Sequence, residues 1–174
     1  EKIKSWNTTH CAIGGFFPKA EDFNQATWSE FIERFNAIAK TMHSSGVRIG
    51  YHNHSHEMVQ INGRTVMEML IDALDPSVWF EIDTYWIAHG GGDPAAWIRK
   101  VQSRIHALHC KDFAINVERE HVMTEVGSGN LNWPAIFEAA ENAGVQWYVV
   151  ERDRGELDPF DSLEVSINNF RKML

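Results

Sequence analysis

Hydrophobic and polar positions along this chain show two patterns, one typical of strands and one typical of helices, and segments with the two patterns alternate. Short apolar runs predict β-strands at 8–14, 47–52, 78–83, 104–110 and 147–151. Stretches with apolar residues three and four positions apart predict α-helices at 27–46, 64–74, 95–101, 132–144 and 162–174. Strands that alternate with helices in this way are typical of a parallel sheet built from consecutive βα units.

Capping residues support several of these helices. Thr27 and Glu30 have the spacing of a capping box at the start of the first helix, and Gly46 supplies its end. Asp93 precedes a proline and predicts the N-cap of the third helix, while Asn132 predicts the cap of the fourth. The sequence therefore predicts where several helices begin or end as well as their order.

The composition indicates one globular domain over residues 1–174. Hydrophobic residues make up 44% of the chain, and the formal net charge is −8. Such a charge, without any basic run, disfavours a nucleic-acid partner, because affinity for phosphates comes largely from Lys and Arg. The chain contains no run of about 18 apolar residues, so the sequence predicts no membrane span. We expect Cys11 and Cys110 to be buried free thiols rather than a disulfide.

Polar residues end four successive predicted strands. They are His52, Asp83, His109 and Glu151. Both faces of a parallel sheet are buried, so a charged group at the carboxyl end of a strand is costly unless it faces a site. Ligands of parallel α/β folds bind at that end. One such residue alone is often a helix cap or a structural histidine, but four together predict a shared site.

Imidazole nitrogens and carboxylate oxygens are ligands of divalent metals. The set suits Mn, Zn, Co, Fe or Mg, and the nitrogens favour the transition metals. Lys111, two residues after His109, can act as an electrophile or proton shuttle if its pKa is lowered, or it is an exposed loop residue. The glycine-containing segment 125–133 either presents backbone N–H groups to a ligand or forms a turn and a helix cap.

Several motifs occur in a fixed order along nearly the whole chain. They read GYHNHSHEM, FEIDTYW, RIHALHCKD, VGSGNLNW and VVERD. In this order and spacing the chain resembles the sugar isomerase/epimerase family of xylose isomerase-like TIM barrels. That superfamily also includes inosose dehydratases, hydroxypyruvate isomerases, ketose 3-epimerases and endonuclease IV enzymes. The resemblance implies a divalent metal at the top of a (β/α)8 barrel.

The resemblance also implies roles for individual residues. The family holds its metal by Glu, Asp, His and Glu on strands five to eight, and Asp83, His109 and Glu151 match the last three. His52 occupies the first position, and Glu57 either shares or replaces it or binds substrate hydroxyls. His54 is then left as an acid or base, beside Glu151 and Lys111 as catalytic residues.

The number of strands departs from a complete barrel. A (β/α)8 barrel takes about 250 residues, and this chain supplies only the units of strands four to eight. Five strands alone would expose two unpaired edges. We therefore expect a fragment, or a half-barrel that another chain or a missing N-terminal segment completes. The first residue is Glu1 rather than Met, so the compartment stays open between cytoplasm and periplasm.

The function predicted from these residues is a metal-dependent isomerase or epimerase of a sugar or keto-sugar. A base removes the proton next to a carbonyl, and the metal stabilises the enediolate. The alternative is a lyase or dehydratase of 3-keto sugars or glycosides that shares this first step, or a non-catalytic sugar-binding subunit. An endonuclease IV-like activity would need more metal ligands and a basic groove, which the net charge disfavours.

Overall fold

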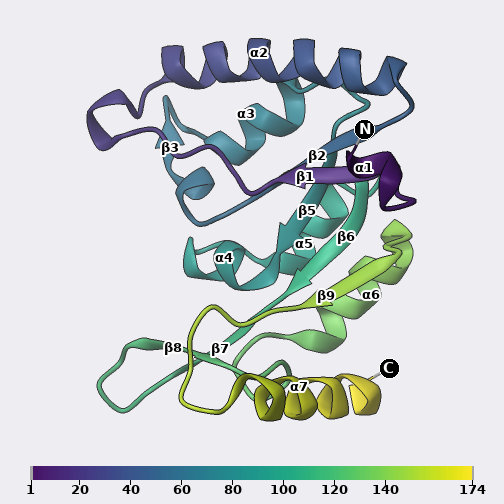
Figure 1. Cartoon of the computed structure of the whole chain (residues 1–174). Coiled ribbons are helices and arrows are strands. Elements are labelled where there is room, and N and C mark those ends of the chain that lie inside the picture. The colour runs from purple at the N-terminus through teal and green to yellow at the C-terminus, as the bar shows by residue number, and fades with distance from the viewer. Residues whose placement is uncertain (1, 174) are drawn as a thin grey trace.

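The protein is described by a computed structural model that covers residues 2–173 (Figure 1). Its central sheet has five parallel strands in the order β1-β2-β5-β6-β9. These strands are β1 (His10–Ile13), β2 (Arg48–His52), β5 (Trp79–Asp83), β6 (Ile105–Cys110) and β9 (Trp147–Val150). Strands that neighbour one another in the sheet therefore follow one another along the chain, as repeated βα units require.

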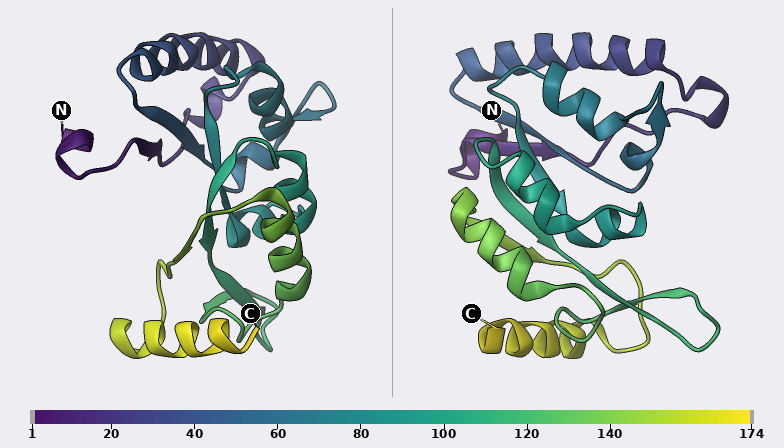
Figure 2. Two further views of the ribbon diagram at one scale, coloured as in Figure 1. Left: turned by 90° about the vertical axis from the view of Figure 1, so that its right-hand side faces the viewer. Right: turned by 180° about the vertical axis from the view of Figure 1, so that it is seen from behind.

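Helices alternate with the strands of this sheet. They are α1 (Lys2–Ser5), α2 (Gln25–Ser44), α3 (Val66–Ala73), α4 (Thr84–His89), α5 (Pro94–Lys100), α6 (Trp133–Ala143) and α7 (Pro159–Met173). The left view of Figure 2 shows α3, α5 and α6 along one side of a curled sheet whose other side is open. On the last strand, Trp147 is 68% and Val149 42% exposed. This curled, open half-barrel confirms the expected incomplete (β/α)8 barrel.

The helix boundaries follow from local chemistry, with one correction. Helix α2 begins two residues earlier than predicted, because the side chain of Asn24 accepts a hydrogen bond from the Thr27 amide and caps the helix. The predicted Thr27 cap is therefore wrong. Asp93 and Asn132 cap α5 and α6 as predicted, and each helix carries proline in its first turn.

A capping box that was not predicted starts α3. Thr65 and Glu68 exchange side-chain to backbone hydrogen bonds there, which satisfies two amides at the helix start. Apolar faces of the helices then pack on the sheet and form one continuous core. Among its members, Trp28 on α2, Leu70 on α3, Ile98 on α5 and Ile136 on α6 are almost completely buried.

Some elements were not predicted from the periodic pattern. Helix α4 directly follows β5, and an antiparallel hairpin of β7 (Asp112–Ile115) and β8 (His121–Thr124) follows β6. A second small pair consists of β3 (Gln60–Ile61) and β4 (Arg64–Thr65). The 3-10 turns are η1 (Ala20–Asp22) and η2 (His56–Met58). All of these lie in connections between the main strands and helices.

Two further expectations concern the cysteines and membrane crossing. Both cysteines are free thiols; Cys110 is buried and Cys11 is half-buried. Within residues 2–173, no helix is both long and apolar enough to cross a membrane.

Candidate metal centre and active site

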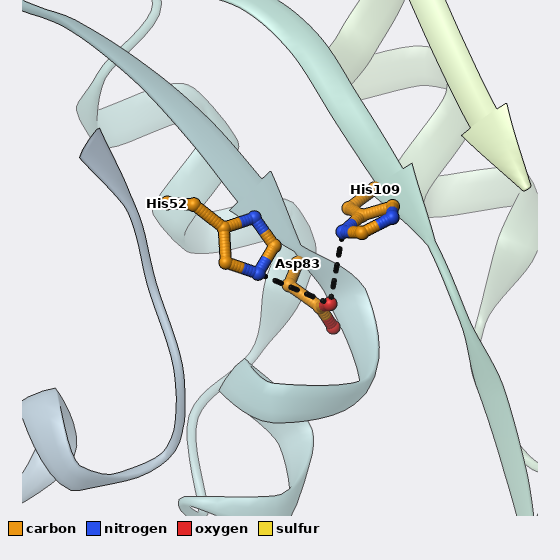
Figure 3. A group of neighbouring side chains, drawn as sticks. All are labelled: His52, Asp83 and His109. Carbon is orange, nitrogen blue, oxygen red and sulfur yellow. Dashed lines mark ion pairs between the residues drawn. The ribbon is translucent and has the colours of Figure 1, made fainter. Parts of the chain in front are cut away.

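Three of the four predicted strand-end residues meet at the carboxyl end of the sheet. His52, Asp83 and His109 each place one ligand atom within 4.8 Å of the others. Figure 3 shows both imidazole rings turned toward the same carboxylate. His52 Nε2 lies 3.6 Å and His109 Nδ1 3.4 Å from Asp83 Oδ2. The three residues come from the ends of the neighbouring strands β2, β5 and β6, as parallel pairing predicts.

Two buried polar side chains hold these strand ends in register. Asn53 Oδ1 accepts a hydrogen bond of 2.9 Å from the Asp83 amide, which ties the end of β2 to the end of β5. The Thr84 hydroxyl donates to the Lys111 carbonyl at 2.6 Å and accepts from the Lys111 amide at 3.0 Å. Both residues are completely buried. The ligand atoms are therefore positioned by bonds between strands rather than by a mobile loop.

The two carboxylate oxygens of Asp83 have different surroundings. Oδ1 accepts a hydrogen bond from the Trp86 amide and caps α4. Oδ2 is buried and has no hydrogen-bond partner among the described residues. Burial raises the pKa of Asp83 to about 6, although the Lys111 ammonium opposes the shift. The Lys111 ammonium forms an ion pair with this oxygen at 3.3 Å, and the two imidazoles that also face it add nitrogen donors, so a bound divalent cation would fit there.

His109 shows the same incomplete bonding. Its buried Nδ1, which faces Asp83, also has no hydrogen-bond partner within the described part of the chain. Burial, and then the neighbouring His52, lowers the pKa of His109, which favours the neutral ring that binds metals. Two imidazole nitrogens and one carboxylate oxygen are a donor set that suits Zn²⁺, Mn²⁺, Fe²⁺ or Co²⁺. The residues present therefore fit a divalent metal.

Glu151 lies at the edge of this trio. Its carboxylate is 2.8 Å from His109 Nε2 and 2.7 Å from Lys111 Nζ, and its side chain is 46% exposed. It contacts the nitrogen of His109 that faces away from Asp83. Glu151 thus borders the candidate centre from β9 without being one of the three clustered ligands.

Lys111 is buried among carboxylates rather than exposed on a loop. Its ammonium lies 3.3 Å from Asp83, 2.7 Å from Glu151 and 2.8 Å from Asp153. Burial alone would lower the pKa of Lys111, but the surrounding carboxylates outweigh it and raise the pKa above the ordinary value. The lowered pKa on which a shuttle role depended is therefore not found. Lys111 is instead a fixed positive charge beside the candidate centre.

His54 faces the same cavity from the segment after β2. The cavity has a volume of about 340 Å³ and is also lined by His52, His109, Lys111 and Glu151. Burial, followed by the neighbouring His52 and His56, lowers the pKa of His54 to about 4. Its Nδ1 is buried and without a hydrogen-bond partner among residues 2–173. His54 is therefore neutral at pH 7, and its lowered pKa makes it a weak base.

Glu57 belongs to a separate network. One carboxylate oxygen accepts a 2.5 Å hydrogen bond from the Tyr51 hydroxyl, and the other accepts one of 2.8 Å from the His54 amide. His56 lies 3.2 Å from the same carboxylate. Burial raises the pKa of Glu57, and the contacts to His56 and Tyr51 oppose that shift. The structure thus brings Glu57 under the His54 backbone and outside the three-ligand cluster.

Two carboxylates near the centre were missed by sequence reasoning. Glu81 lies 3.0 Å from His52 Nδ1, and Asp153 binds Lys111. Glu81 precedes Asp83 by two residues on a strand, so both side chains point to the same face. A charged residue inside the apolar run FEID was the available signal. Asp153 lies beyond the end of β9 and carried no such pattern.

The glycine-containing segment 125–133 turns inward instead of facing a ligand. Its amides at Gly127, Gly129 and Leu131 donate to the buried carboxylate of Asp112, as does the Trp133 indole. Gly127 has φ +79°, and a Cβ on Gly129 would lie 2.4 Å from Asp112 Oδ1. These amides are therefore occupied, and of the two predicted alternatives the structure shows the turn and helix cap.

Comparisons with known proteins find relatives of this chain. The chain is 28% identical to an inosose dehydratase of Geobacillus thermodenitrificans, over 83% of this chain and 54% of that protein. It is 25% identical to the rhizopine catabolism protein MocC of Rhizobium meliloti, over 84% of this chain and 50% of that protein. The chain therefore spans about half the length of these curated relatives.

A solved structure shows the same arrangement of strands and helices. It is a sugar phosphate isomerase/epimerase from Parabacteroides distasonis, with a TM-score of 0.75 and 28% identity, covering 92% of this chain and 56% of that one. The model of the xylose isomerase-like TIM barrel family matches residues 6–173. This chain therefore belongs to the xylose isomerase-like TIM barrel family.

Proposed function

We propose that this chain carries the metal-binding side of an enzyme that removes a proton next to a carbonyl of a sugar or keto-sugar. The observation that carries the proposal is the meeting of His52, Asp83 and His109 around a buried carboxylate oxygen that has no hydrogen-bond partner within residues 2–173. Relatives named inosose dehydratase and sugar phosphate isomerase/epimerase support a polyhydroxylated substrate. The remaining barrel strands would come from another segment or chain.

The proposed ligands are His52, Asp83 and His109, with Glu151 as the fourth residue at the edge. Glu57 was also predicted as a ligand, but its oxygens bind Tyr51 and the His54 amide, and we leave it out of this set. When bound, a divalent metal polarises a substrate carbonyl and lowers the pKa of the neighbouring C–H group.

Two side chains are placed to accept the proton. His54 is neutral at pH 7 and lines the cavity, and Glu151 reaches the same cavity from β9. Lys111 keeps its charge beside them and would stabilise negative charge that develops on a substrate oxygen. Return of the proton to the adjacent carbon gives isomerisation, and return to the opposite face of the same carbon gives epimerisation.

A dehydratase is the second candidate. Its first step is the same proton removal, after which the electron pair expels a hydroxyl group from the next carbon and water leaves. The curated relatives named inosose dehydratase favour this outcome. The proton taken by His54 or Glu151 can be returned to the departing hydroxyl so that water leaves, while the Lys111 ammonium in the same cavity stabilises the negative charge as a fixed positive charge.

Proton exchange in D₂O tests the proposal and separates its outcomes. The full natural polypeptide, loaded with Mn²⁺ or Zn²⁺, is incubated with a panel of ketoses and inososes and followed by NMR. We expect deuterium at the carbon next to the carbonyl, and the product identifies isomerase, epimerase or dehydratase. No exchange with any substrate, in protein that binds metal, would leave the sugar-binding subunit as the better explanation.

Metal binding is measured separately by ICP-MS and calorimetry. We expect His109→Ala to lose metal relative to wild type, because it removes one of three clustered ligands. His43→Ala is the matched control, since His43 is an exposed histidine on α2. Equal metal content in all three proteins would contradict the proposed centre.

A further inference from the structure

The two clustered histidines are each held between Asp83 and a second carboxylate, but on opposite ring nitrogens. His109 faces Asp83 through Nδ1, and its Nε2 lies 2.8 Å from Glu151. His52 faces Asp83 through Nε2, and its Nδ1 lies 3.0 Å from Glu81. The two rings therefore have the same kind of environment with the nitrogens exchanged.

Glu81 differs from Glu151 in its surroundings. Its side chain is 19% exposed, against 46% for Glu151. The register of β2 and β5 pairs Glu81 directly with His52, so the two side chains are neighbours on one face of the sheet. Strand pairing thus fixes this contact, whereas Glu151 lies beyond the end of its strand. Glu81 is built into the sheet beneath the candidate centre.

An imidazole binds a metal only through a nitrogen that carries no proton. An ionised carboxylate accepts hydrogen bonds and cannot donate them, so Glu81 requires the proton of a neutral His52 to sit on Nδ1. That tautomer leaves a lone pair on Nε2, which faces Asp83 at 3.6 Å. Carboxylates that contact the outer nitrogen of a ligating histidine commonly orient the ring in this way.

We propose that Glu81 is a positioning residue that holds His52 as its Nδ1–H tautomer and so directs the Nε2 lone pair toward Asp83. Glu81 is not one of the three clustered ligands; it acts through its contact with His52. The expected effect of Glu81 on metal binding rests on the proposed function, whereas its effect on the tautomer of His52 does not. The two claims can therefore be measured separately.

The tautomer is measured in the metal-free protein by long-range ¹H–¹⁵N correlation NMR of labelled histidines. His52 is assigned by the signal that His52→Asn removes. We expect Nδ1–H in wild type and a shift toward Nε2–H in Glu81→Ala. Glu81→Gln keeps an accepting oxygen without the charge and should lie between them. Asp153→Asn, a carboxylate change in the same cavity that contacts Lys111, should leave the His52 signal as in wild type.

Metal titration adds a second readout. We expect Glu81→Ala to weaken Zn²⁺ binding about 10- to 100-fold, the usual effect of losing such an outer contact. A wild-type His52 protonated at Nε2, or the same tautomer and affinity in Glu81→Ala as in wild type, would overturn the role of Glu81. A wild type that binds no metal would instead contradict the proposed function, while the tautomer result would still stand.

Discussion

Two buried aspartates make opposite use of their carboxylates. Asp112, the first residue of β7 and two residues beyond β6, accepts hydrogen bonds from three amides of segment 125–133, from the Trp133 indole and from the Phe113 amide. Asp83, at the end of β5, uses Oδ1 to cap α4 but leaves Oδ2 without a hydrogen bond among the described residues. Both side chains are almost completely buried.

The difference separates a structural carboxylate from a candidate functional one. The hydrogen bonds to Asp112 come from backbone amides and an indole. Asp112 therefore holds segment 125–133 in place, and both of its oxygens are occupied. Asp83 is surrounded by the imidazoles of His52 and His109, which can bind a metal, and by the positively charged ammonium of Lys111. Burial alone does not distinguish the two aspartates; the nature of the donors does.

Removal of Asp112 should have the largest effect. Asp112→Ala leaves four donors of segment 125–133 without an acceptor, three part-buried amides and the buried Trp133 indole, so we expect the free energy of unfolding to fall by about 4 kcal/mol. Chemical denaturation followed by tryptophan fluorescence measures this, since Trp133 is one of the donors. A loss below about 1 kcal/mol would show that water replaces Asp112 and would remove the contrast with Asp83.

Asp83→Asn should give the reverse pattern. We expect metal affinity to fall at least about 100-fold, because the substitution removes the charged ligand that both histidines face. The metal-free protein should stay as stable as wild type at pH 7, or become more stable, since an ionised Asp83 is costly in the fold. Calorimetry and denaturation measure the two quantities, and Asp112→Asn is the matched comparison. A large stability loss with unchanged metal affinity would make Asp83 a second structural carboxylate.

The pH dependence of stability gives the smallest of these effects. Burial raises the pKa of folded Asp83 to about 6 from an ordinary 3.8. Between these values the folded protein keeps a proton that the unfolded chain has released, so stability falls as pH rises through this window. The fall should be on the order of 2 kcal/mol in metal-free protein. Denaturation from about pH 4 to about pH 7 should show this slope in wild type minus Asp83→Asn; a flat difference would contradict the raised pKa.

The main elements and part of the site could be predicted from the sequence. Period, caps and strand-end residues predicted the five strands, most helices and the approach of His52, Asp83 and His109. The connections were harder. Helix α4 is only six residues long, and the β7–β8 hairpin depends on pairing that a strand–helix pattern does not encode.

The surroundings of several side chains depend on contacts that local sequence does not encode. Glu57 lies close to His52 along the chain, but the turn after β2 directs it to Tyr51 instead. The amides of segment 125–133 face Asp112, which no local pattern indicates. Lys111 acquires its raised pKa from Asp83, Glu151 and Asp153, which come from two different strand ends.

What the sequence determined by itself is the order of elements and the residue types at the carboxyl ends of the strands. Periodicity and capping act over one or two turns of chain, so they can be read locally. Only the tertiary structure decided which oxygens and nitrogens remain free for a ligand. That depends on contacts between residues far apart in the chain, such as His52 with Glu81 and Asp112 with Trp133. Such contacts occupy polar atoms, and the candidate centre lies where His52, Asp83 and His109 still turn ligand atoms toward one another.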